Sequence, residues 1–342
     1  MKKSTLWLSC FLTFFSVFAH AQTIHIDTLL EDKISIRAIA IDGKSVWYGA
    51  DKGRFGKIDF EKRTRDKRQV FLDTMKIEFR NIAQTSKAVF VLKIGNPALL
   101  YKIDKSTMAE TLVYSEQHPN VFYDSMQFWD DLEGMAMGDP IDGCFSILTT
   151  RDGGNTWQKK SCKDLPVLAQ GEAAFAASNT NLVVNGNQAW MVSGGKKARV
   201  FHSPDRGKTW STAETPIEQG QAMTGIYTAD FYDEKRGVVA GGNYDQQQQN
   251  TQNKAMTRDG GKTWQLVANG AGFGYASCIQ YVPDSKGMKL VCVGGTGVYF
   301  SDDAGQTWKQ LSTDRDFYTL RFIDGCTAIA AGKNKLVRLT FK

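Results

Sequence analysis

Seven polar residues have the side-chain types that suit binding of an anion or a polyhydroxyl ligand. Arginine holds carboxylates through its planar fork, and two nearby carboxyl groups can hydrolyse a glycoside. We assign them one equivalent position, near the start of the innermost strand in each of seven predicted units: Arg37, Arg80, Asp124, Glu172, Tyr227, Ser277 and Tyr318. They can act together only if the fold brings these strand starts to one place.

Four eight-residue phrases show how the strands are connected: TRDGGNTW at 150–157, SPDRGKTW at 203–210, TRDGGKTW at 257–264 and SDDAGQTW at 301–308. A short Asp side chain accepts hydrogen bonds from the backbone of its own turn, and Gly supplies the positive φ of a hairpin loop. Thr and Trp favour the strand that follows. Each phrase therefore predicts a hairpin with a structural role for these residues: Asp152, Gly154, Trp157, Asp205, Gly207, Trp210, Asp259, Gly261, Trp264, Asp303, Gly305 and Trp308.

Calcium binding is the functional alternative for the four Asp side chains of these phrases. Calcium needs six to eight oxygen ligands, and the phrases place single carboxylates in separate units. A structural turn at the rim is therefore the favoured interpretation, and no metal site is predicted.

The spacing of the phrases predicts a ring of repeated sheets. Their Asp residues lie 53, 54 and 44 positions apart, which is typical of propeller blades with four strands each. Weaker copies occur at 36–53 and 79–96, and 317–342 supplies only three strands. We predict an all-β, seven-bladed propeller in which residues 23–30 pair with the last blade and close the ring; six or eight blades stay open.

The four phrases resemble the Asp-box, or BNR, repeat of bacterial β-propellers. The whole layout is most similar to the exported propellers of the photosystem II stability/assembly factor family, and this resemblance implies a non-catalytic binding or assembly role. Asp-boxes also occur in sialidases, to which the resemblance is more distant.

The predicted function is a binding or assembly scaffold that contacts an unknown protein or glycan partner through its axial funnel. The alternative is a sialidase-like glycoside hydrolase that uses Asp124 and Glu172, on adjacent blades, with Tyr227 and Tyr318. The sequence offers only two plausible arginines for a sialidase triad and contains no Phe-Arg-Ile-Pro motif. No Gly-x-Gly-x-x-Gly motif is present at a strand–helix junction, and the three histidines beyond the signal are scattered, so no cofactor is expected.

Residues 1–21 have the order of a cleaved export signal: two lysines, an apolar core and Ala19-His20-Ala21. The mature chain is then one domain over 22–342, exported to the periplasm or secreted, without a membrane span, and we expect a monomer. A formal charge of only +6 and the lack of a basic stripe with interleaved aromatic residues do not indicate nucleic-acid binding.

Five cysteines follow the signal. Cys144 and Cys162 flank the first phrase symmetrically, which predicts a disulfide across two outer strands. Cys278 and Cys292 flank a turn in a similar way and are a second candidate pair, which would leave Cys326 as a buried free thiol. The polar segment at 241–254 is predicted to project from the ring on the funnel side.

Overall fold

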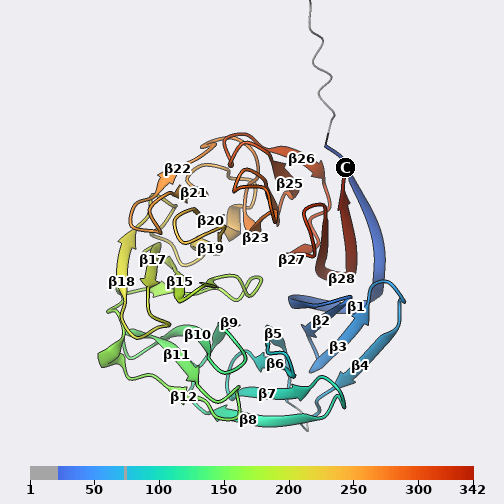
Figure 1. Cartoon of the computed structure of the whole chain (residues 1–342). Coiled ribbons are helices and arrows are strands. Elements are labelled where there is room, and N and C mark those ends of the chain that lie inside the picture. Colours follow the sequence, from blue (N-terminus) through green and yellow to red (C-terminus); the bar gives the residue numbers. More distant parts are fainter. Residues whose placement is uncertain (1–21, 73–74) are drawn as a thin grey trace, which may run out of the picture.

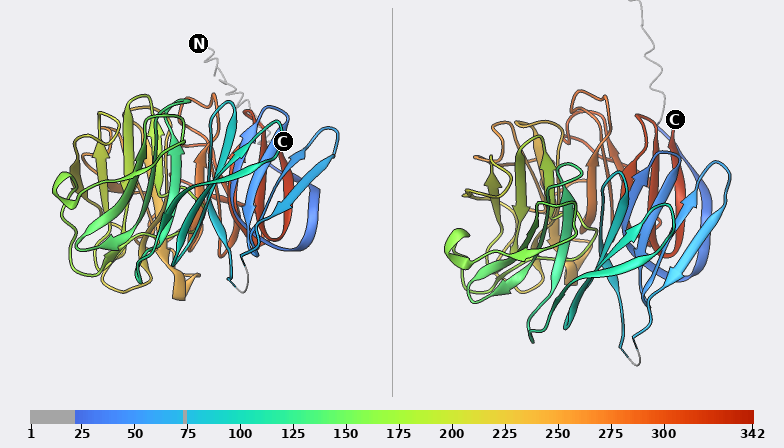
Figure 2. Two further views of the ribbon diagram at one scale, coloured as in Figure 1. Left: turned by 90° about the horizontal axis from the view of Figure 1, so that it is seen from below. Right: turned by 60° about the horizontal axis from the view of Figure 1, so that its bottom comes forward.

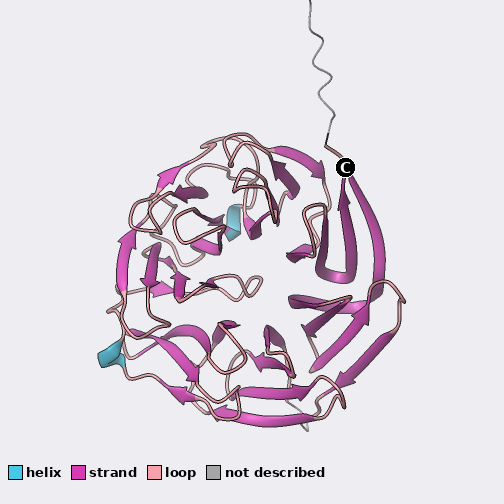
Figure 3. Cartoon of the chain, in the orientation of Figure 1, coloured by secondary structure: helices cyan, strands magenta, loops and turns pink. Residues whose placement is uncertain are grey.

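The computed structural model describes residues 22–72 and 75–342, so the predicted export signal at 1–21 lies outside the described residues. The described chain forms a ring of strands around a central axis (Figures 1 and 3). Its helical segments are two short 3-10 helices, η1 (Cys162–Asp164) and η2 (Tyr244–Gln246). The predicted all-β propeller class is confirmed.

Four of the sheets each contain four strands. One holds β5 (Phe79–Gln84), β6 (Ala88–Lys93), β7 (Ala98–Asp104) and β8 (Glu110–Glu116). The next holds β9 (Tyr123–Phe128), β10 (Gly134–Ile141), β11 (Cys144–Thr150) and β12 (Gln158–Lys159). The third holds β14 (Leu182–Asn185), β15 (Gln188–Val192), β17 (Arg199–Ser203) and β18 (Ser211–Glu214). The fourth holds β23 (Ala276–Tyr281), β24 (Leu290–Gly294), β25 (Gly297–Ser301) and β26 (Lys309–Ser312).

Two further sheets contain six strands each. One is built, in spatial order, from β13 (Glu172–Ala173), β16 (Gly194–Gly195), β19 (Thr224–Phe231), β20 (Gly237–Asn243), β21 (Lys254–Thr257) and β22 (Gln265–Leu266). The other is built from β27 (Phe317–Phe322), β28 (Thr327–Phe341), β1 (Ile24–Asp42), β2 (Ser45–Ala50), β3 (Arg54–Asp59) and β4 (Arg65–Gln69).

Counted as hydrogen-bonded sheets, the ring has six blades, and the predicted number of seven is corrected. The difference arises because β1 and β28 each run through a bend without a break in strand pairing. β1 pairs with β28 from Ile24 to Ser35 and with β2 from Ile36 to Asp42. The units predicted as first and last are therefore one continuous six-stranded sheet.

The predicted closure by the two chain ends is present in the structure. Ile24 lies opposite Phe341, and the antiparallel ladder continues to Leu30 opposite Leu336. Figure 1 shows the start of β1 lying along β28 at the edge of the ring. The N-terminal strand thus covers an edge of β28 that would otherwise be exposed.

Aromatic side chains fill the spaces between neighbouring sheets. Trp157, from the first repeated phrase, packs edge-on to Phe128 of its own sheet at 5.7 Å and to Phe90 of the preceding sheet at 6.2 Å between ring centroids. Trp264 packs edge-on to Phe231 at 6.1 Å, and Phe231 stacks on Trp190 of the preceding sheet. Contacts of this kind hold the blades at a fixed distance from the axis.

Cys144 and Cys162 are joined by a disulfide with a Cα–Cα distance of 5.6 Å. The other cysteine expectations need correction, because Cys278 and Cys292 are buried free thiols and Cys326 is exposed. Cys278 lies opposite Val293, so Cys292 is one residue away from the facing position. Side chains of successive strand residues point to opposite faces, which separates the two thiols.

Removing the disulfide is expected to destabilise the protein without changing the fold. The bond closes a loop of 18 residues, for which chain entropy gives about 3 kcal/mol. Urea unfolding of a Cys144→Ser/Cys162→Ser variant should show this loss. Cys326→Ser is the control and should change stability by under about 0.5 kcal/mol; an equal loss in both variants would contradict the prediction.

Candidate functional site

The candidate site is the axial channel of the ring, which has two openings. The strand-start mouth is the end where the innermost strands begin, and the strand-end mouth is the end where they finish. Six of the seven predicted site residues occupy one equivalent position beside the strand-start mouth, each at a β-bulge of an innermost strand: Arg37, Arg80, Asp124, Tyr227, Ser277 and Tyr318. Bulges of this kind turn a side chain away from the regular ladder.

Three of these six residues are buried. Asp124 has no exposed surface, and burial, followed by repulsion from Asp139, raises its pKa well above the usual range. The Tyr227 hydroxyl donates to the Met223 carbonyl at 2.9 Å, and the Ser277 hydroxyl donates to a main-chain oxygen. These side chains support the mouth from within and do not reach solvent.

The other three are partly exposed at the strand-start mouth. The Arg37 guanidinium lies over the Tyr318 ring at 4.1 Å and donates to the Ala177 carbonyl at 3.2 Å. Arg80 donates to Glu78 at 2.7 Å. Their role in ligand binding stays a prediction.

Glu172 does not join the ring of bulged residues. Its side chain has no exposed surface and forms an ion pair with Arg199. It also accepts hydrogen bonds from the Ser193 hydroxyl at 2.5 Å and from the Ala169 N–H at 2.9 Å. The innermost strand of the blade to which Glu172 was assigned, β14, begins only at Leu182, so Glu172 precedes that strand by ten residues and lies in another sheet as part of β13.

The residues between Glu172 and that strand enter the channel. We call residues 174–181 the axial plug; Figure 1 shows this connection reaching the centre of the ring. Apart from the partly exposed Phe175, its residues are buried. Small Ala and Ser side chains allow the backbone to fit where six strands converge. Sequence reasoning missed this element, and the available signal was a run, AAFAASNTN, without strand alternation.

The plug is bonded to innermost strands on all sides. The Asn179 amide donates to the Ile82 carbonyl at 2.8 Å, and its oxygen accepts from the Met126 N–H at 2.9 Å. Thr180 contacts the Thr228 hydroxyl at 2.8 Å. These bonds engage the buried side chains of Asn179 and Thr180 and separate the two mouths, whereas the buried Asn181 amide has no partner among the described residues.

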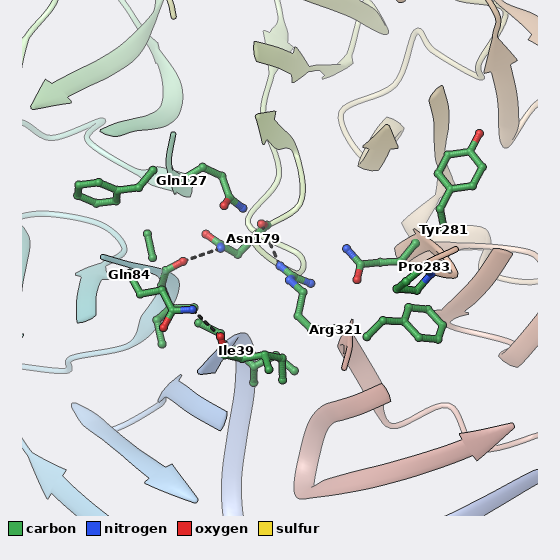
Figure 4. A pocket seen from close by; sticks show the side chains of 14 residues that line it. Ile39, Gln84, Gln127, Asn179, Tyr281, Pro283 and Arg321 are labelled. Carbon is green, nitrogen blue, oxygen red and sulfur yellow. Dashed lines mark hydrogen bonds between the residues drawn. The ribbon is translucent and has the colours of Figure 1, made fainter. Parts of the chain in front are cut away.

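A pocket of about 520 Å³ remains at the strand-end mouth. The plug residue Asn179 lies at its centre, and Gln127 and Arg321 point toward it from surrounding strands (Figure 4). Phe128, Phe322 and the isoleucines of β1 and β5 add apolar surface. We call this cavity the axial pocket.

Most polar groups of the axial pocket are already engaged. Arg321 donates to the Ser178 and Asn179 carbonyls at 3.3 Å and to the Leu320 carbonyl at 2.7 Å. Gln84 donates to the Ile41 carbonyl at 2.5 Å. These side chains hold the plug and the pocket walls in place.

Two carboxamides of the axial pocket remain free. Among the described residues, the side chains of Gln127 and Gln280 have no hydrogen-bond partner within the protein. They come from β9 and β23, which lie on opposite sides of the axis (Figure 1). Each amide offers both a donor and an acceptor, so together they can hold a ligand that presents both.

Among the described residues, Arg321 is the charged side chain that lines the axial pocket, and a buried carboxyl group, Asp230, lies nearby. Burial raises the pKa of Asp230 to about 6, although N–H groups of Tyr281 and Phe231 and the nearby Arg321 charge oppose that rise. Asp230 thus lies behind the wall of the pocket, where its carboxyl group accepts a hydrogen bond from the Tyr281 N–H at 2.6 Å.

The repeated phrases lie on the outer side of the ring, between the two outermost strands of four sheets. In each turn the carboxylate accepts bonds from its own loop. At Asp205, for example, the N–H groups of Lys208 and Thr209 donate at 3.0 and 2.8 Å. Burial alone would raise the pKa of Asp205, but these bonds outweigh burial and lower it to about 2. The carboxylate thus acts within the turn.

The model of the BNR/Asp-box repeat family matches residues 299–310, which include the whole fourth phrase. The chain is a β-propeller with BNR/Asp-box repeats. No curated protein matches its sequence. Among the described residues of this propeller, no helix has the length and apolarity to cross a bilayer, and no three potential metal-binding side chains come together.

Known structures share this propeller fold at low sequence identity. A structure described as YCF48 bound to D1 peptide is 14% identical with a TM-score of 0.66, covering 95% of this chain and 96% of that one. YCF48 from Cyanidioschyzon merolae is 12% identical with a TM-score of 0.62, covering 93% of this chain and 98% of that one. The GH74 xyloglucanase from Xanthomonas campestris is 10% identical with a TM-score of 0.65, covering 92% of this chain and 53% of that one.

Both carboxyl groups of the predicted glycosidase pair are inaccessible in this propeller. Asp124 is fully buried, and Glu172 is enclosed by its ion pair with Arg199. A glycosidase needs two carboxyl groups that reach the scissile bond. The structure therefore does not favour Asp124 and Glu172 as catalytic residues.

The polar segment at 241–254 is folded onto the strand-start mouth. Tyr244 packs edge-on to Tyr275 at 5.1 Å between centroids, and the Tyr275 N–H donates to the Gln247 carbonyl at 2.9 Å. Figure 2 shows η2 projecting from one face of the ring. The segment thus combines a projecting tip with an anchored base.

Proposed function

We propose that this propeller is an exported, non-catalytic scaffold that binds a short extended peptide segment of a protein partner in the axial pocket. The observation that carries the proposal is the pair of free carboxamides, Gln127 and Gln280, in a cavity whose other amide and guanidinium groups are engaged within the protein. A peptide main chain presents alternating donors and acceptors, which are the partners that two glutamine amides lack.

The size and lining of the pocket support a peptide ligand. A volume of about 520 Å³ is within the usual range for small ligand sites, which combine apolar walls with a few fixed polar groups. Phe128 and Phe322 provide apolar surface for side chains of the peptide. The plug makes the floor rigid, which reduces the entropy lost on binding.

Two further observations support the remaining parts of the proposal. A peptide is bound in one structure of similar fold, although that likeness extends to the fold alone. The predicted export signal at 1–21 and the Cys144–Cys162 disulfide are consistent with an oxidising compartment outside the cytoplasm.

Replacing both free glutamines is expected to weaken peptide binding while preserving the fold. The probe is a random peptide library displayed on phage, selected against the mature protein, and the selected peptides are then measured by fluorescence anisotropy. Gln127→Leu/Gln280→Leu should weaken binding at least about tenfold, because two buried hydrogen-bonding groups of the peptide lose their partners. Gln158→Leu, on the exposed outer strand β12, is the matched control.

A second set of variants locates the site on the channel. Arg37→Gln/Arg80→Gln changes the strand-start mouth and should leave binding of the same peptides unchanged. Loss of binding in this variant, with full binding by Gln127→Leu/Gln280→Leu, would move the site to the other mouth. Failure to select any peptide would contradict peptide binding altogether.

A further inference from the structure

A second cavity lies away from the axis, where the outer part of β1 meets the sheet edge formed by β4. Its volume is about 650 Å³, larger than that of the axial pocket. Its base consists of the buried side chains Leu30, Ile34, Tyr48 and Ile58, and its rim is formed by exposed residues of β4 and by Glu31 and Asp32 of β1. We call this cavity the seam cavity.

The strand at the rim has a free edge. β4 is the last strand of its sheet, and no other strand among the described residues pairs with its outer side. The Thr64 carbonyl and the Val70 N–H bond toward β3. Alternate residues of an antiparallel strand face opposite sides, so the main-chain groups of Arg65, Lys67 and Gln69 face outward.

Positive charge is concentrated at this edge. Residues 61–69 carry five basic and two acidic side chains, a net charge of +3 in a chain of +6. Arg54 and Arg65 are engaged by Asp51 and by the Leu29 carbonyl. Lys67 and Arg68 have no carboxylate partner among the described residues. Their charges are free to meet a ligand.

The edge strand of the neighbouring sheet does not share this charge. The edge strand of the next sheet, β8, contains Glu110 and Glu116 and no basic residue. Basic side chains on an edge strand can also serve to prevent association. That role alone does not account for an apolar cavity beneath the strand.

From these observations we infer that β4 is a docking edge for an acidic, extended segment of a partner protein. The segment pairs as an added strand with the outward main-chain groups of residues 65, 67 and 69. Its carboxylates meet Lys67 and Arg68, and one apolar side chain enters the seam cavity above Ile34 and Tyr48. Added strands of this kind gain affinity from the main chain and specificity from pockets for alternate side chains. This site is independent of the axial pocket.

Synthetic hexapeptides test the inference with the mature chain. The probes are acetylated, amidated Glu-Val-Glu-Leu-Glu-Val and its basic counterpart Lys-Val-Lys-Leu-Lys-Val, measured by fluorescence anisotropy. The acidic peptide should bind, more weakly as NaCl rises from about 50 to about 500 mM, and the basic peptide should not. Lys67→Glu/Arg68→Glu should weaken binding at least about tenfold. Lys208→Glu/Lys262→Glu, which makes the same charge change in two Asp-box turns, should not.

A proline substitution distinguishes peptide binding by strand addition from binding by charge attraction alone. Lys67→Ala removes a charge, whereas Lys67→Pro removes the same charge and an outward N–H that the sheet does not use. Binding should be at least about threefold weaker in the Pro variant than in the Ala variant. The acidic peptide N-methylated at its central Glu and Leu should bind the unchanged protein as weakly as the unmethylated peptide binds the Pro variant. This measurement tests strand addition even if the Pro variant does not fold.

Several outcomes would overturn the inference. These are no binding of the acidic peptide, equal binding of the basic peptide, equal affinity of the Pro and Ala variants with no effect of N-methylation, and unchanged binding by Lys67→Glu/Arg68→Glu. Concentration-dependent self-association in light scattering, abolished by Lys67→Pro, would assign the edge to a second copy of this chain in place of a partner.

Discussion

Deletion of residues 22–31 is expected to cost most of the stability of the protein and to cause self-association. The deleted strand buries Leu29 and Leu30, which are 2% and 9% exposed. Burial of a leucine side chain contributes about 1.5–3 kcal/mol, so these two residues alone account for about 3–6 kcal/mol. Whole domains are stable by only about 5–15 kcal/mol.

The same deletion uncovers the edge of β28. Leu336, Val337 and Leu339 are almost fully buried in the intact ring, and their strand pairs with the segment that is removed. An apolar strand edge left open is a template for pairing with another chain. Size-exclusion chromatography should therefore show oligomers, and urea unfolding should show a lower midpoint.

A peptide added in trans gives this prediction a control. The synthetic segment QTIHIDTLLEDKI, residues 22–34, should restore the monomer and raise the unfolding midpoint of the truncated chain. The same composition in scrambled order should do neither. A truncated chain that remains monomeric and unfolds at the original urea concentration would show that the ring does not depend on this closure.

The closure and the ring of bulged residues could be predicted because both follow from local counting. The acidic turns after the innermost strands, such as the one ending at Asp130, Asp233 or Asp324, fix how many residues precede the turn. Counting back six positions reaches Asp124, Tyr227 and Tyr318, which all lie at bulges. The residues that occupy equivalent positions in different blades can thus be identified from the sequence.

Exposure of these residues could not be predicted in the same way. Whether Asp124 reaches solvent depends on the plug, which lies far from it in sequence and fills the channel beside it. Nothing in the sequence near Asp124 indicates that packing. The axial pocket was missed for the same reason. Gln127 and Gln280 stand out as free amides only in the structure, where the other amide and guanidinium groups of the pocket are hydrogen-bonded within the protein.

Errors of register explain the thiol predictions. Cys278 and Cys292 flank one turn, but the bulge at Ser277 and the length of the turn place Cys278 opposite Val293. A shift of one residue reverses the face of every side chain. The exposure of Cys326 follows from its position in the IDGCT turn, a local feature that was available in the sequence.

Loss of the Glu172 carboxylate is the second change expected to have a large effect. Glu172 has a fully buried side chain, and its partner Arg199 is 15% exposed. Removing one member of a buried ion pair leaves an uncompensated charge and costs about 3–5 kcal/mol. We expect the lower end, about 3 kcal/mol, for Glu172→Ala because Arg199 keeps some contact with water.

A double variant shows whether this loss comes from the unpaired charge. Glu172→Met/Arg199→Met removes both charges and fills the space with apolar groups, and such replacements are often neutral or stabilising. Its urea unfolding midpoint should lie close to that of the unchanged protein and above that of Glu172→Ala. A double variant less stable than Glu172→Ala would mean that the ion pair itself, with its bonds to Ser193 and Ala169, holds this part of the ring together.

Variants of Glu172 also distinguish the proposed scaffold function from the alternative glycosidase function. If Glu172 were catalytic, Glu172→Gln would abolish release of sugar from generic glycosides while changing stability little, because catalytic carboxylates face the substrate and not a buried arginine. If its role is the ion pair, Glu172→Gln should lower stability because a neutral amide cannot balance the charge of Arg199. We therefore expect a lower unfolding midpoint for this variant and no glycoside hydrolysis before or after the change. Hydrolysis by the unchanged protein that disappears in Glu172→Gln at unaltered stability would establish the enzyme.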